Sequence, residues 1–422
     1  MAIESDVLVV GGGLAGLTSA LSAAQAGAHV RLVSYKQSSM RQASGLVDLL
    51  GYVGDDAVVD PYDAMDRLHD EHPYRLVGTQ TVKEGMALFD DVVDGYSGSH
   101  TDTNALLPTH GGTVKPTARY PRSAMEGIAS DNRDMLLVGF DTLVDFDAPL
   151  AAAHLEAAGA PFAADGVQIP FPGDVRPDAK VTHYAKMLDQ DSEVAVSGRK
   201  TSAREALAER VEPHLEGHER VGFPAILGDD NTTTVRSTLA DALGAAVFEV
   251  PMGPPSLPGL RLEDRLYTAL DEYGASFEMG NPVIDHESGD AIDHVVVEHT
   301  GAPVPYSADQ FILATGGLVS KGVTSNRAGV REPVFDCHIP HPGDRYDWFE
   351  DGVFDDHEFA RFGVDVGPDL RPRDSSGEIE FSNLRAAGAT LGGYDFAAEK
   401  SGSGVSIATG YEAGRLATEE IA

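Results

Sequence analysis

The sequence predicts an α/β protein: a Rossmann-like domain with a parallel sheet and a β-meander crossover, interrupted by an inserted α+β domain. Three observations lead to this fold class. The apolar run Val7–Val10 leads into glycines and an Ala/Leu-rich segment, which is the order strand, tight turn, helix. A second apolar run ends in Ala-Thr-Gly-Gly at 314–317, and a Gly/Ser loop at 402–404 precedes the last helical segment.

Length and pattern set the expected domain boundaries. The 422 residues suffice for two or three domains, and the 42% hydrophobic content supplies a sizeable core. We expect the Rossmann-like domain to be discontinuous in sequence and to comprise residues 1–60, 248–325 and 376–422. We expect a cap domain that contacts a substrate or a partner, comprising residues 61–247 and 326–375.

The charge balance argues against one class of partner. The chain has 67 acidic and 31 basic residues and a net charge of −36, so nucleic acid is not an expected ligand. The acidic residues are scattered along the whole chain, which indicates a solvated acidic surface of the kind that keeps proteins soluble in concentrated salt. We therefore expect the cytoplasm of a halophilic archaeon as the source.

Cysteine and hydropathy exclude further classes of site. The single cysteine, Cys337, excludes an internal disulfide and a cysteine-ligated iron–sulfur cluster. No pair of histidines or acids has a recognised metal-ligand spacing, so no metal site is expected. No run is long and apolar enough to span a bilayer, so any membrane association is expected to come through a partner.

The glycine-rich turn after the first strand is the main candidate site. Gly11, Gly13 and Gly16 fit the pattern G-x-G-x-x-G, in which the glycines make the turn, admit a pyrophosphate and let the helix pack closely. Free backbone N–H groups at the helix N-terminus favour an anion there. Gly12 and Ala15 lie in the same turn and complete the predicted cofactor-binding set.

The end of the second strand departs from the dinucleotide pattern. An acidic residue is expected about twenty residues beyond the glycine loop to hold the adenosine ribose, but Ser34 ends the strand. No Asp or Glu occurs between Asp6 and Asp48. Two interpretations remain: hydroxyls such as that of Ser34 hold the ribose, or the ligand is a mononucleotide such as FMN. A third, NADP, is open because three cations that could meet a phosphate lie nearby: Arg31, Lys36 and Arg41.

Three later stretches complete the predicted cofactor site. The small-residue loop after the second strand can pass across a bound ring, and the strand end at 314–317 gives a second close backbone approach. The N-terminus of the last helix would stabilise negative charge on a reduced flavin. The candidate contacts in these stretches are Ser44, Gly45, Ala314, Thr315, Gly316, Gly388, Gly404 and Val405.

These stretches, in this order, resemble a flavoprotein with two dinucleotide-binding domains. A closer resemblance is to the B subunit of anaerobic glycerol-3-phosphate dehydrogenases, and it extends over nearly the whole chain. Its specific parts are Gln37–Leu50, with Gln-Ser followed by Ser-Gly-x-x-Asp-Leu-Leu, and the proline-rich 254–259, Pro-Pro-Ser-Leu-Pro-Gly. Segments 107–117, 223–228 and 249–262 also resemble this family.

The resemblance implies a cofactor, partners and a reaction. It implies FMN in this chain, with FAD as the alternative, an A subunit that contains FAD, and an iron–sulfur C subunit that docks at the inner face of the cell membrane. The implied reaction oxidises sn-glycerol 3-phosphate to dihydroxyacetone phosphate and passes the electrons to a quinone. Two other functions stay open: an NAD(P)-dependent reductase, and a non-catalytic electron-relay or assembly subunit. The residues do not indicate a catalytic base, or whether the substrate site lies on this chain or on the A subunit.

Overall fold

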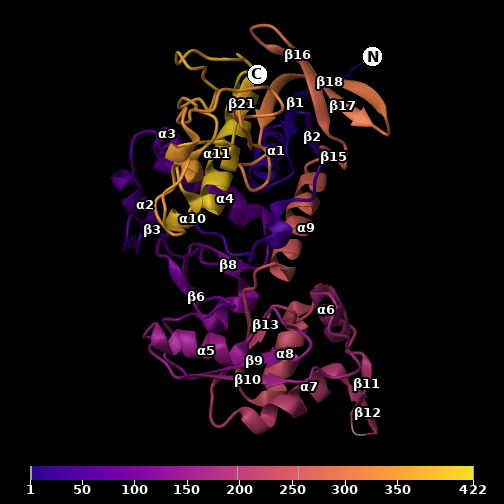
Figure 1. Ribbon diagram of the computed structural model, residues 1–422. Coiled ribbons are helices and arrows are strands. Elements are labelled where there is room, and N and C mark those ends of the chain that lie inside the picture. Colours follow the sequence, from indigo (N-terminus) through magenta and orange to yellow (C-terminus); the bar gives the residue numbers. More distant parts are fainter. Residues whose placement is uncertain (1, 197, 255, 422) are drawn as a thin grey trace. The chain divides into compact units, whose positions relative to one another are not determined.

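The computed structural model describes residues 2–196, 198–254 and 256–421 (Figure 1). The chain divides into two compact units. Unit 1 comprises Met1–Ser39, Asp48–Asp94 and Glu263–Ala422, and unit 2 comprises Met40–Val47 and Gly95–Leu262. Each is described by itself below.

Unit 1 is built on a seven-stranded sheet with the order β15-β2-β1-β18-β17-β16, and β21 pairs with β18. Strands β15, β2, β1, β18 and β21 are parallel, whereas β16, β17 and the first half of β18 form an antiparallel meander. This arrangement confirms the predicted parallel sheet with a meander crossover. The strands are β1 (Ile3–Val10), β2 (Val30–Ser34), β15 (Ser276–Met279), β16 (Val283–Ser288), β17 (Ile292–His299), β18 (Ala302–Leu313) and β21 (Leu384–Ala386).

Two helices pack closely beside this sheet, α1 (Leu14–Gln25) and the yellow α11 (Gly402–Glu419) in Figure 1. Glycines on α11 allow the contact. A Cβ at Gly410 would lie 2.5 Å from the carbonyl oxygen of Ala15, and one at Gly414 would lie 2.3 Å from that of Ser19. The apolar β1 strand is buried, as expected for a strand covered on both faces.

The other elements of unit 1 are short, apart from α4 (Thr79–Val92), which packs against α11. The remaining helices and strands are β3 (Tyr52–Val53), β4 (Asp56–Ala57), α2 (Pro61–Ala64), α3 (Pro73–Val77), β19 (Thr324–Asn326), β20 (Gly329–Arg331) and α10 (Phe396–Glu399). The 3-10 helices are η2 (Met65–Arg67), η5 (Arg345–Trp348), η6 (Glu358–Arg361) and η7 (Gly388–Thr390). Helix α9 (Leu257–Glu272) begins in unit 2 and ends in unit 1.

Unit 2 contains a four-stranded sheet with the order β10-β9-β13-β14, and all of its pairings are parallel. Alternate residues of β9 face opposite sides: Leu136 and Val138 join one apolar cluster, and Met135 and Leu137 join another. The strands and helices are β9 (Met135–Phe140), α5 (Ala148–Ala157), β10 (Ala164–Ile169), α6 (Val181–Asp189), α7 (Ala203–Val211), β13 (Arg220–Pro224), α8 (Thr232–Leu243) and β14 (Ala246–Val250).

Small hairpins and 3-10 turns complete unit 2. They are η1 (Ser39–Gln42, which starts in unit 1), β5 (Tyr96–Ser97), β6 (Ala105–Pro108), β7 (Val114–Thr117), β8 (Tyr120–Pro121), η3 (Arg122–Gly127), β11 (Glu193–Val196), β12 (Arg199–Ser202) and η4 (Glu212–His214).

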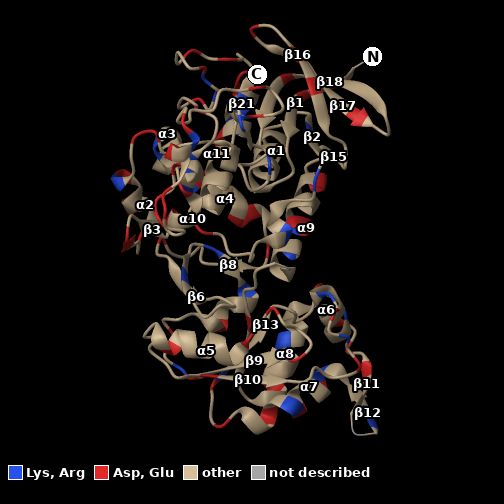
Figure 2. Cartoon of the chain, viewed as in Figure 1, with Lys and Arg blue, Asp and Glu red and all other residues tan. Residues whose placement is uncertain are grey.

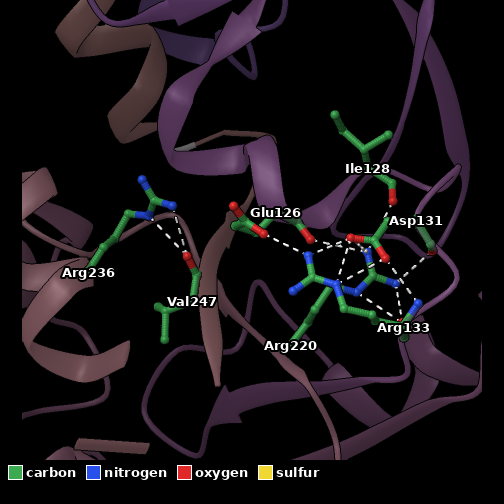
Figure 3. A network of polar contacts seen from close by, with 7 residues as sticks. All are labelled: Glu126, Ile128, Asp131, Arg133, Arg220, Arg236 and Val247. Atoms are coloured by element: carbon green, nitrogen blue, oxygen red, sulfur yellow. Dashed lines mark hydrogen bonds and ion pairs between the residues drawn. The ribbon is translucent and has the colours of Figure 1, made fainter. Parts of the chain in front are cut away.

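A buried arginine ties η3 to the sheet of unit 2 (Figure 3). The guanidinium of Arg220, at the start of β13, donates hydrogen bonds of 3.0–3.1 Å to the carbonyl oxygens of Glu126, Ile128, Asp131 and Arg133. Burial lowers the pKa of Arg220. The hydrogen bond from Arg133 is the main reason that the pKa of Asp131 falls to about 2. The four carbonyls fix the loop before β9 against β13.

The structural units differ from the boundaries expected from the sequence. Segments 61–94 and 326–375 lie in unit 1, whereas 40–47 and 248–262 lie in unit 2. The reason is tertiary: α4 packs on α11, and the N–H of Val364 donates to the carbonyl of Thr390 over 2.8 Å. The expected α+β character of the insertion also differs, because its strands alternate with helices and form a parallel sheet.

Acidic side chains lie along helices and loops of each unit (Figure 2). In the part of the chain that the structure describes, no helix has both the length and the apolar character needed to cross a bilayer.

Candidate nucleotide-binding site

The turn between β1 and α1 has room only for glycine at two of its fingerprint positions. Gly11 has φ +124°, and a Cβ there would lie 2.2 Å from the carbonyl oxygen of Ala314. A Cβ at Gly16 would lie 1.9 Å from the carbonyl oxygen of Gly11. Both distances are shorter than any real contact, so these glycines let the first turn of α1 and the end of β18 approach β1 closely.

The N-terminus of α1 is open where the fingerprint places a phosphate. Gly13 is the N-cap, has extended backbone and makes no side-chain capping bond. Among the described residues, no heavy atom beyond its chain neighbours lies within 4 Å of a Cβ built at Gly13. The first-turn N–H groups, which include that of Ala15, have no carbonyl partner inside the helix and add to its positive end. This geometry suits an anion such as a pyrophosphate.

Two hydroxyl groups lie beside Gly12, where the dinucleotide pattern has an acid nearby. A Cβ at Gly12 would lie 2.8 Å from Ser34 Oγ and 2.7 Å from Tyr267 Oη. Ser34 is buried at the end of β2, and its hydroxyl donates to the carbonyl of Lys36 over 3.1 Å. The Tyr267 hydroxyl contacts the sulfur of Met279 at 3.1 Å. Sequence reasoning missed Tyr267, which comes from helix α9, 233 residues after Ser34.

The structure gives Arg31 a carboxylate partner. Its guanidinium lies 3.0 Å from Glu278 Oε1, and the same oxygen accepts a 2.7 Å hydrogen bond from Tyr306. Burial and the neighbouring Glu278 raise the pKa of Tyr306. Because Arg31 is neutralised in this network, the structure does not favour the suggestion that it meets an NADP phosphate. The ammonium of Lys36 is at the surface, 5.8 Å from the ring centre of Tyr35.

The end of β18 presents an unsatisfied hydroxyl. The N–H of Ala314 donates to the carbonyl of Val10 over 2.9 Å, which fixes this end against β1. The Thr315 hydroxyl is buried and has no hydrogen-bond partner among the described residues. Gly316 has φ +83°, and its N–H donates to Thr390 Oγ1 over 2.9 Å. A buried hydroxyl without a partner costs free energy, so a ligand that accepts from Thr315 would be stabilised.

Gly388 and the start of α11 lie in contact with the protein itself. Gly388 has φ +71°, and a Cβ there would lie 2.5 Å from the Cβ of Ala15. The N–H of Gly404 donates to the carbonyl of Asp48 over 2.8 Å. A Cβ at Gly404 would lie 2.1 Å from Tyr74 Oη, and Val405 is fully buried. Packing in this structure therefore accounts for Gly404 and Val405, which stay predictions as cofactor contacts.

A buried polar cluster that sequence reasoning missed lies beside this helix start. His72 Nδ1 accepts the N–H of Tyr74 over 3.1 Å, and its Nε2 lies 3.1 Å from Glu399 Oε2. The Tyr74 hydroxyl donates to the carbonyl of Ser401 over 3.3 Å, and burial raises the pKa of Tyr74. The Tyr394 hydroxyl is buried without a hydrogen-bond partner among the described residues. These residues are far apart in the sequence and carry no recognisable motif.

Ser44 and Gly45 lie in unit 2, in the loop after η1. Ser44 Oγ accepts the N–H of Leu46 over 3.4 Å. Gly45 has φ +76°, and its carbonyl accepts a 2.7 Å hydrogen bond from Tyr96. A Cβ at Gly45 would lie 2.6 Å from the Cβ of Pro258, which is in the proline-rich stretch; Pro255 of that stretch is outside the described residues.

No group of three or more His, Cys, Asp or Glu in the described ranges is arranged to hold a metal ion. The thiol of Cys337 is buried, and burial together with nearby carboxylates raises its pKa. A thiol in such surroundings is unreactive.

Comparisons with known proteins agree with this site. Residues 6–405 match the family described as FAD binding domain. The chain is 62% identical over 424 residues to the B subunit of a probable anaerobic glycerol-3-phosphate dehydrogenase of Halobacterium salinarum, covering 100% of this chain and 99% of the relative. It is 31% identical over 430 residues to the B subunit of the anaerobic glycerol-3-phosphate dehydrogenase of Vibrio cholerae, covering 97% and 95%. Among solved structures, 3-ketosteroid delta1-dehydrogenase from Sterolibacterium denitrificans aligns with 99% of this chain and 100% of its own, at 10% identity and a TM-score of 0.45.

These matches correct one expectation. FMN was expected first and FAD second, but the matching family is one of FAD binding domains, so the match supports a flavin, and supports FAD rather than FMN. The physical reason lies in the turn at Gly11–Gly16, which is complete for a pyrophosphate, a group that FMN lacks. The relative from Halobacterium agrees with the halophilic archaeal source expected from the charge.

Proposed function

Because this chain belongs to the FAD-binding domain family and to the family of anaerobic glycerol-3-phosphate dehydrogenase B subunits, we propose that it is the flavin-carrying B subunit of a three-subunit enzyme. The enzyme oxidises sn-glycerol 3-phosphate to dihydroxyacetone phosphate. The electrons pass through an iron–sulfur C subunit to a quinone, and the A subunit holds its own FAD. The C subunit keeps the assembly at the inner face of the membrane.

The observation that carries the proposal is the open positive end of α1 behind a turn that admits only glycine at Gly11 and Gly16. The orphaned hydroxyl of Thr315 lies at the end of β18, the strand that pairs with β1. An open anion site and an unsatisfied buried donor are what a nucleotide cofactor requires of its protein.

Each part of the proposed FAD has protein groups to hold it. The N–H groups of the Gly11–Gly16 turn bind the pyrophosphate, and the hydroxyls of Ser34 and Tyr267 bind the ribose in place of the missing acid. Thr315 hydrogen-bonds to the cofactor. The bound flavin supplies two-electron redox chemistry, and the protein orients it and tunes its charge.

Of the alternatives, the NAD(P)-dependent reductase is the less well supported, because Glu278 neutralises Arg31. The electron-relay role stays open within the proposal, since a bound flavin does not fix which subunit oxidises the substrate.

The test is to identify the cofactor chemically. The chain is purified in concentrated KCl, denatured in acid, and the released cofactor is separated by chromatography. We expect FAD in about equimolar amount. Release of FMN alone would overturn the pyrophosphate assignment, and a colourless chain within an assembled complex would overturn the flavin role altogether.

A further inference from the structure

Residues 344–361, here called the aromatic loop, expose several large apolar side chains within a short stretch of unit 1. Phe354 is 100% exposed and Val353 is 83% exposed. Three more exposed apolar side chains belong to the same loop: Tyr346, Phe349 and Phe359. Contiguous apolar surface of this kind on a folded protein marks an interaction site.

The base of the loop is anchored by Trp348. This residue is buried, and its ring makes edge contacts with those of His341 and Phe362 at centroid distances of 5.8 and 5.5 Å. The indole N–H donates to the carbonyl of Pro342 over 2.8 Å. The loop is thus a packed part of the unit, which already buries one of its aromatic side chains.

Hydrogen bonds hold the tip of the loop in a defined turn. His357 Nδ1 accepts the N–H of Glu350 over 3.1 Å, and its Nε2 lies 3.1 Å from the carbonyl oxygen of Val353. Asp355 Oδ2 accepts the N–H of Gly352 over 2.9 Å. The turn therefore presents Val353 and Phe354 to solvent by its own structure. Keeping them there costs hydration free energy, which a partner that covers them would recover.

The charge of the loop selects the partner. Two arginines, Arg345 and Arg361, accompany seven acidic residues: Asp344, Asp347, Glu350, Asp351, Asp355, Asp356 and Glu358. Within the described residues, Glu350 and Asp351 make no ion pair, whereas Arg361 pairs with Asp356. An anionic lipid surface repels such a loop. A second copy of this chain would bring the same carboxylates together.

We propose that the aromatic loop docks on another subunit of the same enzyme, one that presents an apolar pocket for Phe354 and Val353 bordered by Lys or Arg. This inference rests on the proposed function, which places the chain in a complex. Apolar anchors at the centre with charged groups at the rim are the usual anatomy of such interfaces.

The test compares two double variants in the assembled enzyme. The tagged chain is co-produced with the A and C subunits in a haloarchaeal host and purified in concentrated KCl, and the molar ratio of co-purified subunits is measured. Val353→Ser with Phe354→Ser removes the anchors. The control is Val144→Ser with Ile284→Ser, which are exposed apolar residues outside the loop. Circular dichroism and bound flavin are recorded for every sample.

We expect the loop variant to lower the yield of the partner subunits by about tenfold or more, with flavin content and circular dichroism unchanged. The control should purify with its partners as the wild type does. Equal recovery with the loop variant would overturn the docking proposal and leave the proposed function intact. Loss of a homodimer, or of binding to anionic vesicles, as the only effect of the loop variant would also overturn it. A flavin-containing wild-type chain that purifies alone would overturn both the docking and the membership of a complex.

Discussion

The α-carbon of Gly16 lies so close to the carbonyl oxygen of Gly11 that an added Cβ would be only 1.9 Å from it. This contact couples the start of helix α1 to the turn that follows β1. Everything proposed for the cofactor depends on it, because the helix N-terminus can face a pyrophosphate only when the helix approaches the strand this closely.

Gly16→Ala should therefore abolish tight flavin binding. The methyl group must push α1 away from the turn, and we expect FAD affinity to fall by about 100-fold or more, or about 2.7 kcal/mol. The measurement is quenching of flavin fluorescence on titration into apoprotein. Gly289→Ala is the control, because no heavy atom lies within 4 Å of a Cβ there. Similar affinity for both variants would contradict the assigned turn.

The hydroxyl pair beside Gly12 makes a second prediction. Tyr267→Phe and Ser34→Ala should each weaken FAD binding by about fivefold, the value of one lost hydrogen bond of about 1 kcal/mol. Tyr273→Phe, just beyond the same helix, is the matched control. If Tyr267→Phe binds FAD like the wild type, the hydroxyl pair does not replace the acid.

A buried ion pair in unit 2 makes the protein sensitive to acid. Arg261 Nη1 lies 2.7 Å from Glu249 Oε2, and Arg261 Nη2 lies 3.0 Å from Glu249 Oε1. Burial raises the pKa of Glu249, but the attraction of Arg261 outweighs this, and the net pKa lies below the ordinary 4.5. The stability that the pair contributes is thus fully present above about pH 4.5, and it is lost as the pH falls through the lowered value.

Glu249→Gln should cost about 3–5 kcal/mol of unfolding free energy at neutral pH, because the arginine is left buried without its charge partner. The deficit relative to the wild type should shrink as the pH falls below 4.5. Denaturant unfolding followed by circular dichroism at several pH values measures both effects. A deficit that stayed constant down to pH 2 would show that the charge of Glu249 is not involved.

Removing salt should destabilise the whole chain. With a net charge of −36, repulsion among carboxylates grows as the screening length rises from about 3 Å at 1 M salt to about 30 Å at 0.01 M. We expect the melting temperature to fall steadily as KCl is diluted from molar to millimolar concentration. A melting temperature independent of KCl would contradict the interpretation of the acidic surface.

The parts of the fold that local patterns specify could be predicted from the sequence. Val7–Val10 with Gly11 and Gly16 predicts strand, turn and helix, because glycine spacing and apolar runs are local signals. The membership of 61–94 and 326–375 could not be predicted, because it depends on contacts such as α4 against α11 between residues more than 300 apart in the sequence.

The site shows the same division. The glycine turn is visible in the sequence, but Tyr267 reaches Gly12 from a helix that begins about 240 residues later. The role of Gly404 could not be predicted either. Its small size looked like access for a cofactor, whereas the structure places Tyr74 and Leu49 where its side chain would be.

The measurement that tests the central claim most directly is the anaerobic visible spectrum of this chain, alone in concentrated KCl and then in complex with the A and C subunits. We predict a flavin band in the purified chain, and bleaching of that band in the complex when glycerol 3-phosphate is added. Bleaching in the isolated chain would also place substrate oxidation on this subunit, whereas bleaching only in the complex would make it the relay. A complex that oxidises glycerol 3-phosphate while this chain shows no flavin band would contradict the account.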